Sequence, residues 1–357
     1  MDINQLRDNI DKLDHQIVEL INERYKYVKG IGELKGSSNS AIYVPEREKS
    51  LLKKLTAINK GDLLTNETLQ AIYREIMSGA IALERPLQIA FLGPKATFTH
   101  QAAIAKFGHS IELIAKSNIA DVFNDIENGR VDYGCVPIEN TTEGAVNHTL
   151  DMFMNSDVRI CAEHNLRVQH SLLSNCKLSE IKTVYSHSQA IAQCRQWLLQ
   201  NIPEAELIET ASTAIAAKLA SKQFGAAAIA SELASEMYNI DILFHNIQDR
   251  SDNITRFMIL GNQKTLPTGD DKTSICFSVH DRIGALYDCL LPFKEENITM
   301  SMIESRPSKL RNWEYFFFVD ILGHRNDEKV QRAFDKLKDL CHVFRILGSY
   351  PRGIIED

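Results

Sequence analysis

The stretch PLQIAFLGP, residues 86–94, marks a change in the spacing of apolar residues along the chain. Before it, apolar side chains recur every three or four residues, which is typical of amphipathic helices. After it, short apolar runs alternate with helical stretches, which predicts an α/β sheet of mostly parallel strands covered by helices. The strands are expected near 88–92, 131–136, 182–185 and 226–230, and the helices near 99–107, 118–128, 188–200 and 212–222.

The segment upstream of this stretch, residues 1–85, lacks strand alternation and predicts an all-α unit. Its apolar spacing indicates a first helix from about residue 3 to residue 35, which is long for a globular protein. A second helix is expected to begin at Pro45, and a third to run over 65–84 with Thr65 as its cap.

The segment downstream follows GNQKTLPTGDDK (261–272), a polar linker that contains Gly and Pro. Its apolar runs occur in the order strand, helix, strand, strand, helix, strand, which predicts a ferredoxin-like βαββαβ unit. The chain is therefore expected to be a multidomain protein, with an all-α domain at 1–85, an α/β domain at 87–262 and an α+β domain at 273–351.

The composition excludes several classes of function. The net charge of −7 argues against general nucleic-acid binding, and no apolar run approaches the length of a membrane helix. The polar, acidic N-terminus does not resemble a signal peptide. Seven cysteines without any C-x-x-C pattern indicate reduced thiols and a cytoplasmic protein. No metal cluster or phosphate-binding loop is evident, so neither a metal nor a cofactor is expected.

Two cations on the first predicted helix are spaced to share one face. Arg24 and Lys35 are 11 residues apart, which is about three helical turns. Long basic side chains placed in this way can converge on a small dianion. By periodicity alone a solvated helix face explains the same pattern, and it is the favoured interpretation.

The residues around these cations change that balance. LRDNIDKLDHQIVELINERYKYVKGIGELK (6–35), followed by VPERE (44–48), resembles the all-α chorismate mutases. The resemblance implies that chorismate is held between cations while it rearranges to prephenate, with Lys35 and Glu84 beside the ether oxygen where negative charge develops. It places these positions in the site, with Val44 acting through its backbone: Arg7, Arg24, Lys35, Val44, Arg47, Glu48, Ala80 and Glu84.

Helix geometry adds a statement about assembly. Arg7 and Lys35 are 28 residues apart on one predicted helix, a separation of about 42 Å at about 1.5 Å per residue. They cannot reach one substrate within a single chain. If both bind chorismate, Arg7 comes from a partner, and an intertwined helical homodimer, or a higher homo-oligomer, is expected.

Glu84 stands where some chorismate mutases carry Gln. A glutamate donates a hydrogen bond to the ether oxygen only when its carboxyl group is protonated. The hypothesis is that burial raises the pKa of Glu84 and keeps it protonated.

Four short polar stretches lie at expected strand ends or turns: LGPKATFTH (92–100), VPIENTTEGA (136–145), VYSHSQAIAQC (184–194) and NITRF (253–257). Ligands of open α/β sheets bind at such ends. Together, and above all through TRF, these stretches resemble the prephenate dehydratases. The resemblance implies a two-lobed fold like that of type-II periplasmic binding proteins, with chain crossings near 165 and 243 and a site in the cleft. Ala96 and Ser188 stand where the family usually has Gly and Pro.

The implied reaction removes CO2 and the ring hydroxyl of prephenate, and the departing hydroxide needs a proton or a strong hydrogen bond. A threonine hydroxyl is too weak an acid to give up its proton at neutral pH, so Thr255 is expected to donate a hydrogen bond within a relay. Its expected partners are Asn140, Ser186 and Gln193. The substrate's carboxylates are expected at helix N-termini near Thr97, Thr99 and Thr141, and at Arg256. For Arg256, a surface or lobe-bridging role remains an equal alternative.

The C-terminal unit resembles ACT regulatory domains through RIGALYDCL (282–290) and ESRP (304–307). The resemblance implies a phenylalanine site between two such domains. It would be formed by Gly284, Ala285, Leu286, Glu304, Ser305, Arg306 and Pro307. The order of the three units resembles the bifunctional chorismate mutase–prephenate dehydratases, which implies chorismate and prephenate as substrates and L-phenylalanine as a feedback effector.

Two alternatives remain open at the level of sequence. A bilobed fold joined to an ACT domain also suits a cytoplasmic amino-acid sensor without catalysis. A dehydratase that uses arogenate is the other, although a fused mutase that makes prephenate disfavours it.

Overall fold

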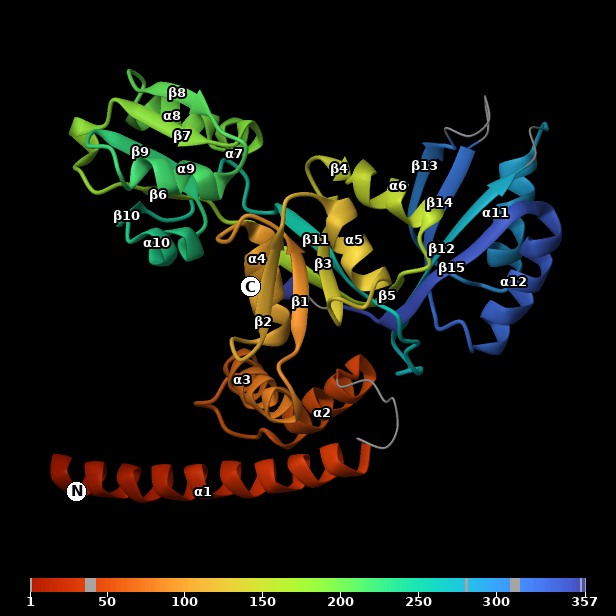
Figure 1. Cartoon of the computed structure of the whole chain (residues 1–357), viewed down its shortest axis with the longest axis horizontal. Helices are drawn as coiled ribbons and strands as arrows, with labels where there is room; N and C mark the ends of the chain where they lie inside the picture. The colour runs from red at the N-terminus through yellow and green to blue at the C-terminus, as the bar shows by residue number, and fades with distance from the viewer. Residues whose placement is uncertain (1, 36–42, 280–281, 309–314, 354, 357) are drawn as a thin grey trace. The chain divides into compact units, whose positions relative to one another are not determined.

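The computed structural model describes residues 2–35, 43–279, 282–308, 315–353 and 355–356 (Figure 1). It divides the chain into two compact units. The first comprises Met1–Leu87 with Phe107–Glu112, and the second comprises Gln88–Lys106 with Leu113–Asp357.

The first unit contains the three helices that the apolar spacing predicts: α1 (Ile3–Lys35), α2 (Pro45–Ile58) and α3 (Asn66–Glu84). The predicted cap is confirmed, because the Thr65 hydroxyl accepts a hydrogen bond from the N–H of Thr68 (3.2 Å). Helix α1 contacts α3 where the Tyr25 hydroxyl donates to the carbonyl of Ile76 (3.1 Å). A Cβ at Gly79 would overlap this hydroxyl, so the glycine permits the close approach.

Helix α1 leaves an apolar stripe uncovered by the described part of the chain. Its members are between 48% and 64% exposed: Leu6, Ile10, Leu13, Ile17 and Leu20. A helix with such a stripe normally buries it against another surface.

The first sheet of the second unit has the order β16-β5-β11-β3-β1-β2, with β4 paired to β3. Strands β1 and β3 are parallel, as predicted, whereas β11 is antiparallel to both β3 and β5. Helices α5 (Ile119–Glu127) and α6 (Asn147–Asn155) supply side chains to its core, and α4 (Phe98–Phe107) follows β1. The strands are β1 (Gln88–Leu92), β2 (Glu112–Lys116), β3 (Tyr133–Asn140), β4 (Gly144–Ala145), β5 (Arg159–Arg167), β11 (Ile254–Gly261) and β16 (Ile355–Glu356).

The second sheet has the order β10-β6-β9-β7-β8 and its own alanine-rich core. Its strands are β6 (Ser171–Leu173), β7 (Thr183–Ser186), β8 (Glu206–Glu209), β9 (Ala226–Ala230) and β10 (Ile242–Phe244). The accompanying helices are η1 (Leu178–Glu180), α7 (Ser188–Gln193), α8 (Arg195–Asn201), α9 (Thr213–Ala220) and α10 (Glu232–Tyr238). The single helix expected over 188–200 is therefore wrong, since it is interrupted at Cys194.

The chain crosses between these two sheets twice. It leaves β5 for β6 after Arg167, and it returns from β10 to β11 before Ile254. The two crossings lie side by side, because the N–H of Val168 donates to the carbonyl of Asn253 (2.8 Å). This two-lobed, twice-crossed arrangement agrees with the periplasmic-binding-protein-like fold that was expected.

The C-terminal part forms an antiparallel sheet of order β13-β14-β12-β15 with two helices. The predicted ferredoxin-like βαββαβ order is therefore confirmed. Its elements are β12 (Asp271–Val279), α11 (Ala285–Glu295), β13 (Met300–Pro307), β14 (Tyr315–Leu322), α12 (Glu328–Leu340) and β15 (Cys341–Pro351).

Strand β15 also contacts the first sheet. Leu347 and Tyr350 belong to the same buried cluster as residues of β3 and β11. A Cβ at Gly348 would overlap the carbonyl oxygen of Ile160 on β5, so only glycine allows this approach. The Arg345 guanidinium donates to the carbonyl of Met154 (2.7 Å), at the end of α6. The first sheet and the C-terminal sheet thus share buried packing.

Among the described residues, no helix has the length and apolar content needed to span a membrane.

Candidate functional site

Thr255 lies at the start of β11, directly after the second crossing, where sequence analysis placed it. It is paired with Asn140 on β3 and with Leu166 on β5. The pairing of β11 with β3 is irregular immediately beyond, between Arg256 and Phe257. Irregularities of this kind often re-aim side chains next to active sites.

Asn140 orients the hydroxyl of Thr255. Its Oδ1 accepts hydrogen bonds from the backbone N–H groups of Thr142 (2.9 Å) and Glu143 (3.1 Å), so this atom is the amide oxygen. The Nδ2 group therefore faces the other way and donates to Thr255 Oγ1 (2.8 Å). Because an amide nitrogen only donates, Thr255 accepts in this contact. Its own proton is not used there.

The contact continues into what we term the Thr255 chain: Thr255, Asn140, Asn253, Gln193 and His170. Asn140 Nδ2 also donates to Asn253 Oδ1 (2.8 Å), and Asn253 Nδ2 donates to Gln193 Oε1 (2.9 Å). The same Gln193 oxygen lies 2.9 Å from His170 Nε2. The structure thus brings Asn140 and Gln193 to Thr255, and it adds Asn253 and His170, which sequence reasoning did not assign.

Ser186 does not join the Thr255 chain in this structure. Its side chain is fully buried at the end of β7, and its Oγ donates to the carbonyl of Ile229 (2.7 Å). Its contacts hold β7 to β9 within the second sheet.

Thr97 and Thr141 mainly organise loops. Thr97 Oγ1 accepts from the N–H of His100 (3.3 Å) at the start of α4, so it caps that helix, while Thr99 is buried within α4. Thr141 Oγ1 accepts from the N–H of Ile254 (3.0 Å) and fastens the beginning of β11. The helix N-terminus expected at 141–144 is wrong, because β4 follows there and α6 begins only at Asn147.

Ala96, at the usual Gly position, has a backbone φ of +68°, and its N–H donates to His100 Nδ1 (3.0 Å). A left-handed φ explains why glycine suits this position. Burial, with Lys95 nearby, lowers the pKa of His100 to about 4, so the imidazole is neutral near pH 7 and can accept.

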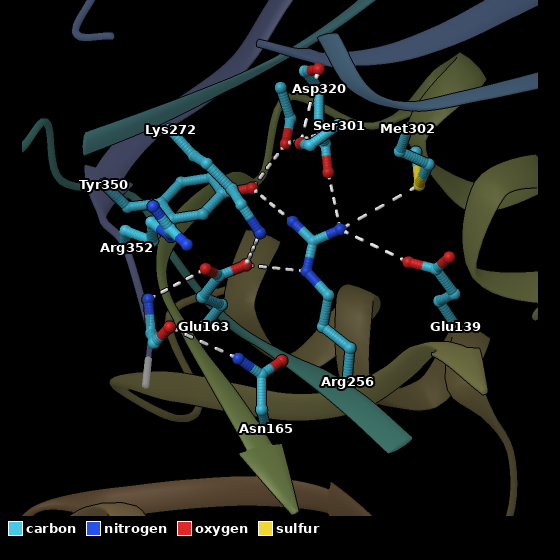
Figure 2. A network of polar contacts seen from close by, with 12 residues as sticks. Glu139, Glu163, Asn165, Arg256, Lys272, Ser301, Met302, Asp320, Tyr350 and Arg352 are labelled. Carbon is cyan, nitrogen blue, oxygen red and sulfur yellow. Dashed lines mark hydrogen bonds and ion pairs between the residues drawn. The ribbon is translucent and has the colours of Figure 1, made fainter. Parts of the chain in front are cut away.

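Arg256 lies apart from the Thr255 chain, since neighbouring residues of a strand point to opposite faces. Arg256 is 7% exposed, and its guanidinium is surrounded by side chains of its own protein (Figure 2). Nε donates to Glu163 Oε2 (2.6 Å) and Nη2 donates to Tyr350 Oη (2.9 Å). Nη1 lies 2.5 Å from Asp320 Oδ2.

We call these residues, with Glu139 at 3.6 Å from Arg256 Nη1, the Arg256 cluster. The carboxylate-binding role expected for Arg256 is not supported by these contacts. The alternative of a bridging arginine describes them, but the bridge joins the first sheet to the C-terminal sheet rather than one lobe to the other.

The charges of the Arg256 cluster stabilise one another. Burial opposes ionisation of Glu163, but Arg256 and Lys272 outweigh it and hold the pKa of Glu163 below its ordinary value. Burial likewise opposes the charge of Arg256, yet Tyr350, Asp320 and Glu163 keep its pKa well above the usual range. Burial, reinforced by Asp320, raises the pKa of Tyr350, so its phenol stays protonated. The cluster is thus a permanent buried ion network at neutral pH.

On the first unit, the described residues show how some of the expected mutase positions lie. Arg24 Nη1 is buried and has no hydrogen-bond partner among the described residues, which marks a cation in need of an anion. Glu48 Oε2 accepts from the Tyr43 hydroxyl (2.8 Å), next to Val44 at the cap of α2. Arg7 and Arg47 are exposed, and Ala80 is buried. The side chains of Lys35 and Glu84 lie outside the described part.

The expected effector positions divide into two groups. Gly284 begins α11 with φ +79°, and nothing lies within 4 Å of a Cβ built there, so its surroundings are open. Ala285 and Leu286 follow it in the first turn. Glu304, Ser305 and Pro307 lie on the edge strand β13. Arg306, on the same strand, instead pairs with Asp151 on α6 through Nε (3.0 Å) and Nη2 (3.3 Å).

The described residues contain no group of three His, Cys, Asp or Glu side chains suited to hold a metal ion. The hydrogen-bond donors at the candidate sites described above are side-chain amides, hydroxyls and guanidinium groups. Such groups bind and orient carboxylates and hydroxyls, and they polarise a leaving oxygen.

Family models match both enzymatic segments. One described as prephenate dehydratase matches residues 89–265, and one described as chorismate mutase type II matches residues 6–85.

Relatives match over the whole length. A bifunctional chorismate mutase/prephenate dehydratase of Aquifex aeolicus (strain VF5) is 46% identical over 360 residues, covering 100% of this chain and 99% of that protein. One from Stutzerimonas stutzeri is 42% identical over 357 residues, covering 98% of each. Among solved structures, a prephenate dehydratase of Arthrobacter aurescens in complex with L-Phe has a TM-score of 0.70 at 32% identity. That match covers 74% of this chain and 90% of the other.

Proposed function

The chain belongs to the bifunctional chorismate mutase/prephenate dehydratase family, and from this membership we propose that its N-terminal helices rearrange chorismate to prephenate and its two-lobed part converts prephenate to phenylpyruvate. The pathway served is phenylalanine biosynthesis. The hydrogen bond from Asn140 to Thr255 (2.8 Å) is the observation that assigns the dehydratase reaction to particular residues. Because Thr255 accepts in this contact, its own proton can point at a substrate.

The dehydratase step removes a carboxylate as CO2 and a ring hydroxyl as hydroxide, and the ring becomes aromatic. We assign Thr255 as the donor to the departing hydroxyl oxygen. Asn140 donates to the Thr255 oxygen, which leaves the threonine O–H free to point elsewhere and makes it a better donor, because hydrogen bonds in a chain polarise one another. A pre-oriented donor stabilises developing negative charge without reorganising at the moment of reaction.

A substrate comparison tests this function. Purified protein is supplied with prephenate or with arogenate, and the keto or amino acid product is measured. Turnover of prephenate with at least tenfold lower activity on arogenate supports the assignment. Preference for arogenate would show that the protein is an arogenate dehydratase instead. If neither substrate is converted, the remaining interpretation is an amino-acid sensor without catalysis.

The mutase site is proposed to be built by two chains. The exposed apolar stripe of α1 supports this assembly, because a second copy of the same helix would bury it. Helix α1 is continuous from Ile3 to Lys35, so Arg7 and Lys35 lie about 42 Å apart at about 1.5 Å per residue. The partner's copy of the helix would bring the distant arginine to each site. Arg24, whose buried Nη1 has no hydrogen-bond partner in the described part of the chain, is the natural cation for one substrate carboxylate.

A complementation experiment tests this assembly. Arg7→Ala and Arg24→Ala are each expected to lose most mutase activity. Co-expression of the two variants should restore roughly a quarter of wild-type activity, because half of the dimers are mixed and each contains one intact site. The dehydratase rate of every sample serves as the control for folded protein. An absence of recovery in verified mixed dimers would contradict donation between chains.

The hypothesis for Glu84 makes a prediction about pH. If a protonated Glu84 donates to the ether oxygen, mutase activity falls as pH rises and the carboxyl group ionises. Glu84→Gln keeps a donor at every pH and should flatten this profile. If the pH profile of mutase activity in Glu84→Gln matches that of the wild type, the proton of Glu84 plays no part in the reaction.

We further propose that the C-terminal unit is an ACT domain that binds L-phenylalanine and inhibits the dehydratase. The open backbone at Gly284 supports a ligand carboxylate there, since N–H groups of the first turn of α11 are the donors. The Arg256 cluster supports the coupling, because it joins β11, which carries Thr255, to β14 and β15 of the C-terminal sheet. Arg306 joins β13 to α6 in the same way.

The cellular compartment is proposed to be the cytoplasm. All seven cysteines are free, and five of them are buried. Such thiols are typical of a reducing compartment.

A further inference from the structure

The Thr255 chain has a direction that the backbone sets. The N–H groups of Thr142 and Glu143 identify Asn140 Oδ1 as an acceptor, and this fixes Asn140 Nδ2 as the donor to Asn253 Oδ1. Asn253 Nδ2 must then donate to Gln193 Oε1. Every amide of the chain is therefore oriented without ambiguity.

His170 is the last member, and its protonation follows from this direction. The Gln193 atom that it contacts is an oxygen, so His170 Nε2 must carry a proton and donate (2.9 Å). The other ring nitrogen, Nδ1, is buried and has no hydrogen-bond partner among the described residues. Burial lowers the pKa of His170 although the Gln193 contact opposes this, so the ring stays neutral at pH 7.

The imidazole is held rigidly. His170 is 2% exposed, and its ring packs edge-on against Phe98 with centroids 5.4 Å apart. Its backbone N–H donates to Gln248 Oε1 (2.9 Å), and its carbonyl accepts from the N–H of Ile247 (2.8 Å). The first crossing is thereby fastened to the second, and the ring cannot turn without breaking this packing.

We propose that His170 is a positioning residue for the dehydratase, which donates through Nε2 to Gln193, keeps that amide from rotating, and so holds Asn253, Asn140 and the hydroxyl of Thr255 in their productive orientation. His170 acts through the chain and does not supply the proton to the leaving group. Without this donor, the Gln193 amide can turn over and present Nε2 to Asn253, which would force Asn253 to turn and would remove the acceptor of Asn140. This inference rests on the proposed dehydratase activity.

Two substitutions separate positioning from packing. His170→Gln keeps an N–H donor at the end of a side chain of similar reach, whereas His170→Leu fills the space without a donor. The loss of one hydrogen bond of this kind lowers kcat by about tenfold in His170→Leu, with KM changed by less than about threefold. His170→Gln should stay within about threefold of wild type. The thermal unfolding of the second unit, compared between each variant and the wild type, shows whether the part that contains His170 is folded.

The outcomes are distinct. Equal loss in both variants would show that the imidazole itself is needed and would overturn the inference, as would an unchanged kcat in His170→Leu. Wild-type protein without prephenate turnover would instead overturn the proposed function. Nitrogen NMR of histidine-labelled wild-type protein gives an independent result: a neutral Nε2–H tautomer is expected for His170, and an imidazolium or an Nδ1–H tautomer would contradict the direction of the chain.

Discussion

Replacing Thr255 by valine is expected to lower the dehydratase kcat by about 100- to 1,000-fold, the usual effect of removing a pre-oriented donor to a developing oxyanion. Valine has nearly the shape of threonine and suits a strand, so β11 should be retained. Thr255→Ser keeps the hydroxyl and should retain measurable activity. The measurement is phenylpyruvate formation from prephenate, with mutase activity as the internal control.

A change at Asn140 tests the same donor from the other side. Asn140→Asp places a carboxylate where the donating amide was, and a carboxylate only accepts. The Thr255 proton would then be drawn toward Asp and away from the substrate, so a loss comparable to that of Thr255→Val is expected. Full dehydratase activity in Thr255→Val would refute the assignment of Thr255, whatever the Asn140 variant does.

The second large effect is expected at Arg256, and it concerns stability. Arg256→Met removes the cation that faces Glu163 and Asp320, whose side chains are 0% and 1% exposed. Uncompensated buried charges of this kind cost about 3–5 kcal/mol. The unfolding transition of the second unit should therefore move to a clearly lower temperature, while that of the helical unit stays in place.

A double variant provides the control. Arg256→Met combined with Asp320→Leu removes both charges and leaves Glu163 paired with Lys272 (3.0 Å), so it should recover much of the lost stability. An Arg256→Met protein as stable as wild type would contradict the buried ion network.

Arg256→Lys keeps the charge but loses the forked donors that reach Tyr350 and Glu163 together. It should raise the phenylalanine concentration for half-inhibition, measured relative to its own uninhibited rate.

The lowered pKa of Glu163 predicts how the stability of the folded protein changes in acid. The pKa of Glu163 is lowered in the folded protein, so its contribution is present above the unfolded carboxylate pKa of about 4.3 and is lost as pH falls through the folded value. The contact between the first sheet and the C-terminal sheet is therefore expected to weaken only in acid. At neutral pH it is constant.

The spacing of apolar residues was sufficient to predict the helices and strands in which that spacing is regular. The 33-residue helix α1, the cap at Thr65 and the βαββαβ order follow from apolar spacing and single capping residues. Thr255, Asn140 and Gln193 were identified through motifs in three separate stretches, and the fold brings them within hydrogen-bond distance of one another or of Asn253.

Contacts between residues that lie far apart in the sequence could not be predicted from the spacing of apolar residues. Sequence places Arg256 next to Thr255, but its partners Glu163 and Asp320 come from strands far away in the chain. The antiparallel pairing of β11 with β5 brings Glu163 beside Arg256, and the packing of the C-terminal sheet brings Asp320. Asn253 gives a weak signal, as a polar residue two positions before Thr255, the first residue of the TRF motif. His170 gives none, because its role depends on contact with Gln193, which lies 23 residues further along the chain.

One coupled assay tests the central claim, that a single chain carries out both reactions and that L-phenylalanine controls them. Purified protein is supplied with chorismate alone, and prephenate and phenylpyruvate are followed with and without L-phenylalanine. Transient prephenate followed by phenylpyruvate is expected, and phenylalanine should cause prephenate to accumulate by slowing the second step. Chorismate consumption that never yields phenylpyruvate, or phenylpyruvate formation that phenylalanine does not change, would contradict the account.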